Sequence, residues 1–279
     1  MQQSRRYKVP TWQSRKKLAL YIMNNNKISD IQVLRDIYNT IKPAIGIKAT
    51  PVKDYRHSKN IQLYQSKFGG VPYLPKNIEY PSTKEGKPLY LLAQINFVDA
   101  PFLEPFPRDG LLQIYIEDNE LYGMGYGGEE SSYKILYIPH PENYDDYQDL
   151  SFLKTPEGFP IEYPHILNFY NTQKPVSALN PNFSEIFEKY IKEDDEEPDF
   201  CDLYSLLIDD FNSHQIGGYP SFVQDGPYLE NEGNYEVLLQ IDSDNHINFG
   251  DAGIATFLIL KEDLKKLDFS KVIYYWDCC

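Results

Sequence analysis

Two short stretches of the sequence decide which fold to expect: FGGVP at residues 68–72 and IGGYP at residues 216–220. Each is followed by an apolar segment with one glutamine, LLAQI at 91–95 and VLLQI at 237–241. A turn and a second apolar run come next, DGLLQIYI at 109–116 and DAGIATFLI at 251–259. Because three features recur in the same order at similar spacing, the sequence predicts two related β units, at about residues 68–138 and 216–276.

The segments around these units have helical patterns. Apolar residues recur at helical spacing over 183–191 and 200–211, which predicts an inserted helical block at about residues 180–212. A capping-box pattern, SDIQ at 29–32, and a stop at Pro43 predict helices within residues 1–43. Further strands are expected near 61–64, 89–97, 133–138 and 272–276, and a short helix near 261–267.

The fold predicted from these patterns is α+β. Internally duplicated antiparallel β units, related by a pseudo-two-fold axis, form one domain over residues 44–279. The N-terminal helices of residues 1–43 precede that domain, and the helical block is inserted between its two units. Whether the two β units are one domain or two stays open, as does the oligomeric state.

Charge limits the kinds of partner. The 279 residues include 41 Asp and Glu against 27 Lys and Arg, giving a net charge of −14. Such a surface repels phosphate backbones, so we expect no nucleic-acid partner, and it attracts a basic protein. The alternative is that the acidity serves solubility alone. No apolar stretch approaches the roughly 20 residues of a membrane span, and we expect no membrane contact.

Catalytic and metal-binding motifs do not emerge from the sequence. It contains no G-x-S-x-G, no phosphate-binding glycine loop and no H-E-x-x-H. The five histidines are scattered, and the adjacent Cys278 and Cys279 make no C-x-x-C pair for zinc. A loop at 242–251 has the composition of a calcium loop, but His246 and Ile247 stand where an EF-hand needs an oxygen ligand and glycine. We therefore predict no metal and no cofactor. Three cysteines are too few for a disulfide scaffold, which favours a reducing, cytoplasmic setting.

Seven residues in or near the repeated stretches are candidate binding residues. A glutamine inside an apolar strand needs partners for its amide, so it either bonds the backbone or reads a ligand. A histidine among them could act as acid or base with an aspartate to orient it. The candidates are Gln94, His214, Tyr219, Gln240, Asp242, Asp251 and Trp276.

The same motifs resemble a bacterial family of unknown function, the YwqG-like family. The resemblance is carried by GGVPYLP at 69–75, LAQIN at 92–96, PRDGLL at 107–112, HQIGGYP at 214–220, LLQID at 238–242 and GDAG at 250–253. The sequence has Tyr80-Pro81 where the family usually has Trp-Pro. The resemblance implies duplicated sheets and no known reaction. A related domain occurs in proteins resembling programmed cell death protein 2, which act as chaperones for a ribosomal protein.

Two functions are carried forward from the sequence. The first is a cytosolic protein-interaction module, a chaperone or an inhibitor of a basic protein, suggested by the charge and the 24 tyrosines. The alternative is a small-molecule binding protein or a hydrolase-type enzyme with a cleft between the β units. Whether the protein is an enzyme stays open, although the lack of a catalytic motif favours binding.

Overall fold

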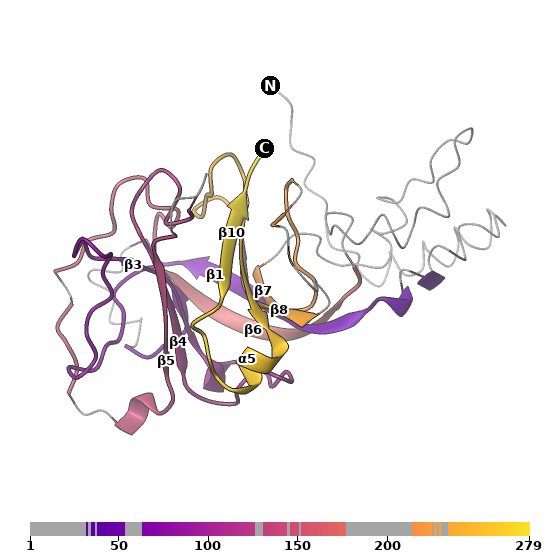
Figure 1. The fold of residues 1–279 in the computed structure, drawn as a ribbon, viewed down its shortest axis with the longest axis horizontal. Coiled ribbons are helices and arrows are strands. Elements are labelled where there is room, and N and C mark those ends of the chain that lie inside the picture. Colours follow the sequence, from indigo (N-terminus) through magenta and orange to yellow (C-terminus); the bar gives the residue numbers. More distant parts are fainter. Residues whose placement is uncertain are drawn as a thin grey trace.

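The described part of the chain is built on one β-sheet. The computed structural model describes residues 41–53, 63–125, 131–143, 146–150, 152–176, 214–224, 226–227, 229 and 234–279, with residues 32, 35–36 and 38–40. Ten antiparallel strands follow each other in the order β10-β9-β8-β7-β1-β6-β2-β3-β4-β5 (Figure 1). No helix in these ranges is long and apolar enough to cross a membrane.

The strands and helices have the following bounds: β1 (Lys42–Pro51), β2 (Lys67–Phe68), β3 (Tyr90–Asn96), β4 (Leu111–Ile116), β5 (Tyr133–Ile138), β6 (His165–Lys174), β7 (His214–Gly217), β8 (Tyr235–Asp242), β9 (Ile254–Leu260) and β10 (Ile273–Asp277). Two 3₁₀ turns, η1 (Phe97–Asp99) and η2 (Pro141–Asn143), follow β3 and β5. Helix α5 (Lys261–Lys265) lies between β9 and β10, and the described positions 32, 35–36 and 38–39 are also helical.

The predicted α+β class is wrong for this part of the molecule, which is nearly all β. The expected helical block at 180–212 lies outside the described residues. The expected N-terminal helices reach them only at isolated positions between 32 and 40. The expected strand near 61–64 is also wrong in its described half, because Leu63 and Tyr64 form a turn.

The prediction of two separate, duplicated β units is corrected by strands β1 and β6. These two pair with each other over ten residues, from Lys42 opposite Lys174 to Pro51 opposite His165. Strand β1 also pairs with β7, and β6 pairs with β2. The stretches at 68–138 and 216–276 are therefore the two ends of a continuous sheet. They do not form two separate sheets.

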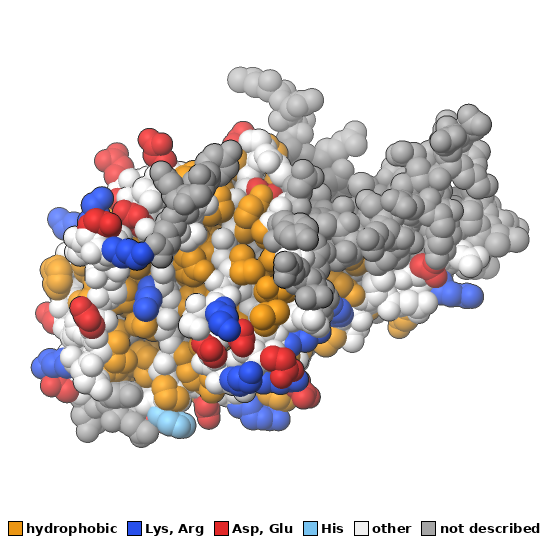
Figure 2. All heavy atoms as spheres, viewed as in Figure 1, with side chains coloured by type: hydrophobic (Ala, Val, Ile, Leu, Met, Phe, Trp, Pro, Cys, Tyr) orange, Lys and Arg blue, Asp and Glu red, His pale blue; other side chains and the backbone are white. Residues whose placement is uncertain are grey.

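The sheet curls until its two ends meet. Tyr133 of β5 and Tyr274 of β10 place their ring centroids 5.6 Å apart, and Tyr137 lies 5.3 Å from Phe269. Hydrophobic side chains gather on the face that carries β10 and β5, with charged side chains around them (Figure 2). We call this contact between β5, β10 and their adjoining loops the seam.

The main core fills the inside of the curl. One cluster of buried residues includes Ile45 of β1, Ile114 of β4, Ile216 of β7 and Phe257 of β9. All six residues of strand β4 are buried. Its outer-facing Leu111 and Tyr115 are covered by smaller clusters that include Tyr73 and Leu89, respectively. The segment between β2 and β3 thus shields the outer face of β4 from solvent.

Candidate functional site

Gln94 is held at the centre of a buried hydrogen-bond network. Its Oε1 accepts from the backbone N–H of Tyr73 at 3.0 Å and from Nε2 of Gln113 at 2.8 Å. Its own Nε2 donates to the carbonyl oxygens of Leu63 and Gln65 at 2.9 and 3.0 Å. The side chain is fully buried. Because these bonds use both ends of the amide, Gln94 fixes the 63–73 loop to the sheet.

Gln240 does the same structural work at the other end of the sheet. Its Oε1 accepts from the backbone N–H of Ser221 at 2.8 Å, and its side chain is buried. Each of the two glutamines therefore holds the residue that follows a Gly-Gly-x-Pro stretch. The glycines of those stretches have positive φ angles, which glycine adopts without steric cost: Gly69 has φ 65° and Gly217 has φ 71°.

His214 and Asp242 lie together, but the imidazole does not meet the carboxylate in the arrangement of an acid–base pair. Nδ1 of His214 accepts from the backbone N–H of Asp242 at 3.0 Å, while Oδ1 of Asp242 accepts from the N–H of Ser243. His214 is buried against the ring of Phe68. Burial lowers its pKa to about 4, although the Asp244 carboxylate opposes this. The ring is therefore neutral at pH 7, with its proton on Nε2.

A second buried histidine was missed by sequence reasoning. His165 lies directly opposite Phe68 in the sheet, and its side chain is fully buried. Neither ring nitrogen has a hydrogen-bond partner among the described residues. Burial lowers the pKa of His165, and Asp244 and the Tyr163 backbone oppose this in part. His246 lies nearby, with its Nδ1 2.8 Å from Oε2 of Glu162. Nothing in the spacing of these histidines signals that strand pairing brings them together.

The remaining candidates lie apart from this group. Oη of Tyr219 donates to the carbonyl of Thr40 at 2.7 Å, and the Lys42 ammonium lies 4.0 Å from its ring centroid. Nε1 of Trp276 donates to the carbonyl of Leu121 at 2.7 Å, so Trp276 belongs to the seam. Asp251 is exposed in the turn before β9. The seven candidates therefore do not form one site.

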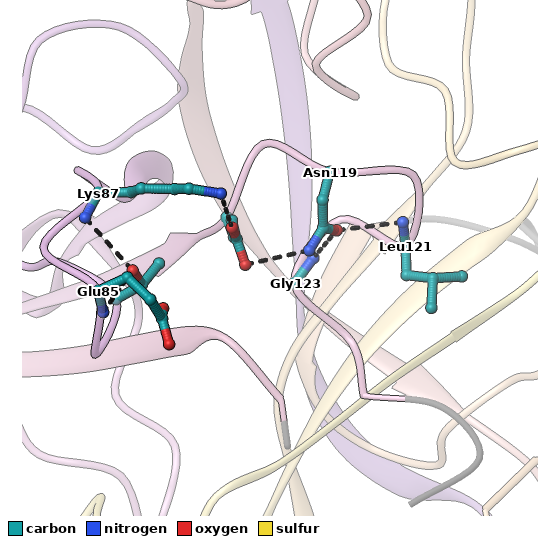
Figure 3. A network of polar contacts seen from close by, with 7 residues as sticks. Glu85, Lys87, Asn119, Leu121 and Gly123 are labelled. Atoms are coloured by element: carbon teal, nitrogen blue, oxygen red, sulfur yellow. Dashed lines mark hydrogen bonds and ion pairs between the residues drawn. The ribbon is translucent and has the colours of Figure 1, made fainter. Parts of the chain in front are cut away.

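The loop that receives Trp276 is itself organised by polar contacts (Figure 3). Oδ1 of Asn119 accepts from the N–H groups of Leu121 and Gly123 at 3.1 and 2.9 Å. Nδ2 of Asn119 donates to Glu117, whose other carboxylate oxygen lies 3.7 Å from Nζ of Lys87. These bonds hold the β4–β5 turn in the shape that presents the Leu121 carbonyl to the tryptophan.

Lys67 is a buried cation that the sequence did not single out. It is 2 % exposed, and its Nζ donates to the carbonyl of Leu63 at 3.1 Å. Burial lowers the pKa of Lys67 to about 7. Lys67 of β2 pairs with Gln94 of β3, so both side chains lie on the outer face of the sheet, under the loop.

A shallow, partly open cavity lies beside the segment after β2. Pro72, Tyr80, Tyr90, Leu153 and Phe159 are among the residues that line it. None of the seven candidate residues does. The described residues also contain no group of three or more His, Cys, Asp or Glu side chains that could hold a metal ion.

Exposed aromatic and acidic side chains come together on the outer side of the 63–78 loop. Tyr64 and Tyr147 are 40 and 45 % exposed, and both contact the buried ring of Tyr73, with ring centroids 4.8 and 6.0 Å away. Oδ2 of Asp99, an exposed residue, accepts from Oγ of Ser66 two positions after Tyr64. We call Tyr64, Asp99, Asp146, Tyr147 and Asp149 the acidic–aromatic surface.

This surface is fixed to the fold through one glutamine. The N–H of Gln148 donates to the carbonyl of Leu74 at 2.8 Å. Its Nε2 donates to the carbonyls of Pro75 and Ile78 at 3.1 and 2.7 Å. The sequence from 142 to 149, ENYDDYQD, has four acidic residues and no basic one. Sequence reasoning missed this surface, although that local excess of acid and tyrosine was a visible signal.

Comparison with known proteins gives the family of the chain. No curated protein matches the sequence. A family model described as a domain of unknown function, DUF1963, matches residues 66–278, which include every strand except β1. The chain belongs to the DUF1963 family.

Proposed function

We propose that the chain is a protein-binding module whose partner is a basic polypeptide, held in the cytoplasm as a chaperone holds a client or an inhibitor its target. The acidic–aromatic surface is the observation that carries this proposal. Exposed tyrosines supply apolar contact area at low entropic cost, and carboxylates around them favour cationic partners. The net charge of −14 supports the same sign of partner.

Two cation–π contacts within the protein illustrate the kind of contact that we propose for the partner. The Arg108 guanidinium lies 3.6 Å from the ring centroid of Phe102, which is 47 % exposed. The Lys42 ammonium lies over Tyr219 in the same way. Such contacts stabilise by about 0.5–1 kcal/mol at exposed sites. The partner we propose would place Arg or Lys side chains over Tyr64 and Tyr147, with Asp99 and Asp149 around them. Asp146 lies 2.7 Å from Nζ of Lys76, so a partner's cation would compete with Lys76 for that carboxylate.

The finer resemblance to the YwqG-like family supports the proposal only by analogy. Related domains in proteins resembling programmed cell death protein 2 act as chaperones of a ribosomal protein, which is a basic client. The alternative of a small-molecule or hydrolase site gains no specific observation. It required a cleft between two β units, and the chain forms one continuous sheet.

The experiment is affinity capture from a native lysate at low and moderate salt, with matched variants. One variant is Asp146→Asn/Tyr147→Ser/Asp149→Asn. The control is Glu120→Gln/Asp251→Asn, which removes the same number of charges from exposed residues elsewhere. Glu120 comes after Ile116, the last residue of β4, whereas Tyr73 covers Leu111, the first. The six residues of β4 separate these two ends by about 20 Å.

A basic protein retained by the wild-type chain and the control, and lost both at higher salt and in the triple variant, would support the proposal. A partner that binds the triple variant as well as the wild type would place the binding elsewhere and overturn it. Recovery of no partner at either salt concentration would also count against it. In that case thermal-shift screening of small molecules follows.

A further inference from the structure

Two consecutive thiols follow strand β10. Cys278 is half-buried and Cys279 is exposed, and both are free cysteines. We propose that Cys278 and Cys279 form a dithiol site for a soft thiophilic ligand of the trivalent arsenic class. This inference is independent of the acidic–aromatic surface, because it rests on a different element at the seam.

The chain that carries these thiols is held firmly. Both carboxylate oxygens of Asp277 accept backbone N–H bonds, from Val223 at 3.0 Å and from Gln224 at 2.7 Å. The side-chain amide of Gln224 donates to the carbonyl of Cys278. A segment that frays holds the geometry of a site poorly. The anchored backbone instead limits the conformations that the first thiol must lose on binding.

Glycines leave the space in which the Cys278 side chain lies. A Cβ at Gly250 would stand 2.6 Å from Sγ of Cys278 and 3.0 Å from the Trp276 ring. A Cβ at Gly253 would stand 2.9 Å from Cβ of Cys278. The Cys278 thiol therefore packs against Gly250 beside Trp276. The Cys279 thiol is exposed, so a ligand can reach it from solvent.

Two adjacent thiols supply the number of sulfur ligands that a monosubstituted trivalent arsenical takes. Zinc sites use four ligands or three with water, and the described residues offer no third His, Cys, Asp or Glu ligand here. Soft thiolates select soft acceptors. With phenylarsine oxide, two As–S bonds form, the As–O bond is broken, and the oxygen leaves as water with the two thiol protons. Arsenic and sulfur keep their oxidation states.

The test uses the full chain in a Cys201→Ser background, so that only the paired thiols remain. Phenylarsine oxide is titrated under reducing conditions, with intact mass and Trp276 fluorescence as readouts. A Trp12→Phe substitution leaves Trp276 as the one tryptophan. We expect a single adduct that survives excess glutathione and is released by 2,3-dimercaptopropanol. Cys278→Ser and Cys279→Ser should each weaken binding by about 100-fold, because one arm of the chelate is lost.

The role of the anchor is tested separately. Gln224 is exposed, so Gln224→Ala should fold normally and still bind phenylarsine oxide more weakly than the wild type. A free peptide with the sequence of residues 274–279 should also bind more weakly than the folded chain. The proposal is overturned if glutathione removes the adduct, if either serine variant binds like the wild type, or if the peptide binds as tightly as the protein.

Discussion

Tyr133 and Tyr274 meet edge to face across the seam, although β5 and β10 stand at opposite ends of the strand order. Oη of Tyr133 donates to the carbonyl of Val272, and Oη of Tyr274 donates to the carbonyl of Tyr122 at 3.1 Å. The curl is thus closed by aromatic side chains that bond to backbone, without a strand ladder between the two ends. Edge strands that approach in this way are partly shielded from pairing with other chains.

Removal of the two seam hydroxyls should destabilise the fold. Tyr133→Phe and Tyr274→Phe each leave a backbone carbonyl without its donor, and each should lower the free energy of unfolding by about 1–2 kcal/mol. Because the two rings are in contact, the stability lost in the double variant should differ from the sum of the two single losses. Urea denaturation measures this. Tyr147→Phe, at an exposed position, is the control and should change stability little. Unchanged unfolding in both single variants would contradict a structural role for the seam.

Gln94→Leu should be among the most damaging substitutions in the sheet. It removes the acceptor of the Tyr73 N–H and one donor from each of the Leu63 and Gln65 carbonyls under the loop, a cost of roughly 2–4 kcal/mol in total. The measurement is the midpoint of chemical denaturation, with Gln224→Leu as an exposed glutamine for comparison. A Gln94 that serves only to read a ligand would instead leave the stability of the unliganded protein intact.

Acid should destabilise the protein through its buried histidines. The pKa of His214 is lowered to about 4 in the folded chain, from 6.5 when exposed. Unfolding therefore takes up a proton between these values, and stability is lost as pH falls from 6.5 toward 4, by about 3 kcal/mol for this residue. His214→Gln, whose amide oxygen can still accept from Asp242, should flatten that dependence. His140→Gln, at an exposed position, should not.

Lys67 should make the free energy of unfolding depend on pH above pH 7. Its folded pKa is about 7 against 10.5 when exposed, so the unfolded chain binds the extra proton between these values. Stability should therefore rise as pH increases from 7 to 10. Lys67→Met should abolish the rise and stabilise the protein at pH 6 by on the order of 3 kcal/mol. Lys48→Met, at an exposed position, is the control. A Lys67→Met protein that keeps the slope would exclude Lys67 as its source.

Much of the sheet could be predicted from local pattern. The strand expected near 133–138 has those bounds in the structure, and the apolar runs at 109–116 and 251–259 become β4 and β9, because each is a dense apolar run limited by turns. Strands β1 and β6 were missed for a physical reason. β1 contains Pro43, Gly46 and Pro51, and β6 ends in the polar run NTQK. These two strands join the ends of the sheet, so their omission turned one sheet into two units.

The site residues divide in the same way. Gln94 and Gln240 were recognised as buried amides that need partners, and both have backbone partners. His165 and Lys67 could not be found, since their burial depends on strand pairing between residues about 100 positions apart, such as His165 with Phe68. Burial that arises from long-range pairing leaves no periodic signal in the local sequence.

The position of β1 has a consequence for synthesis of the protein. Translation completes β1 at residue 51, but its two neighbours begin only at residues 165 and 214. The nascent chain must therefore carry the central strand of its sheet without either hydrogen-bonding partner while more than a hundred further residues are made. Such long-range pairing folds slowly and exposes an unpaired strand to other chains. The ribosome-bound chain is thus at its most aggregation-prone until β7 has emerged, after which the centre of the sheet can close in one step.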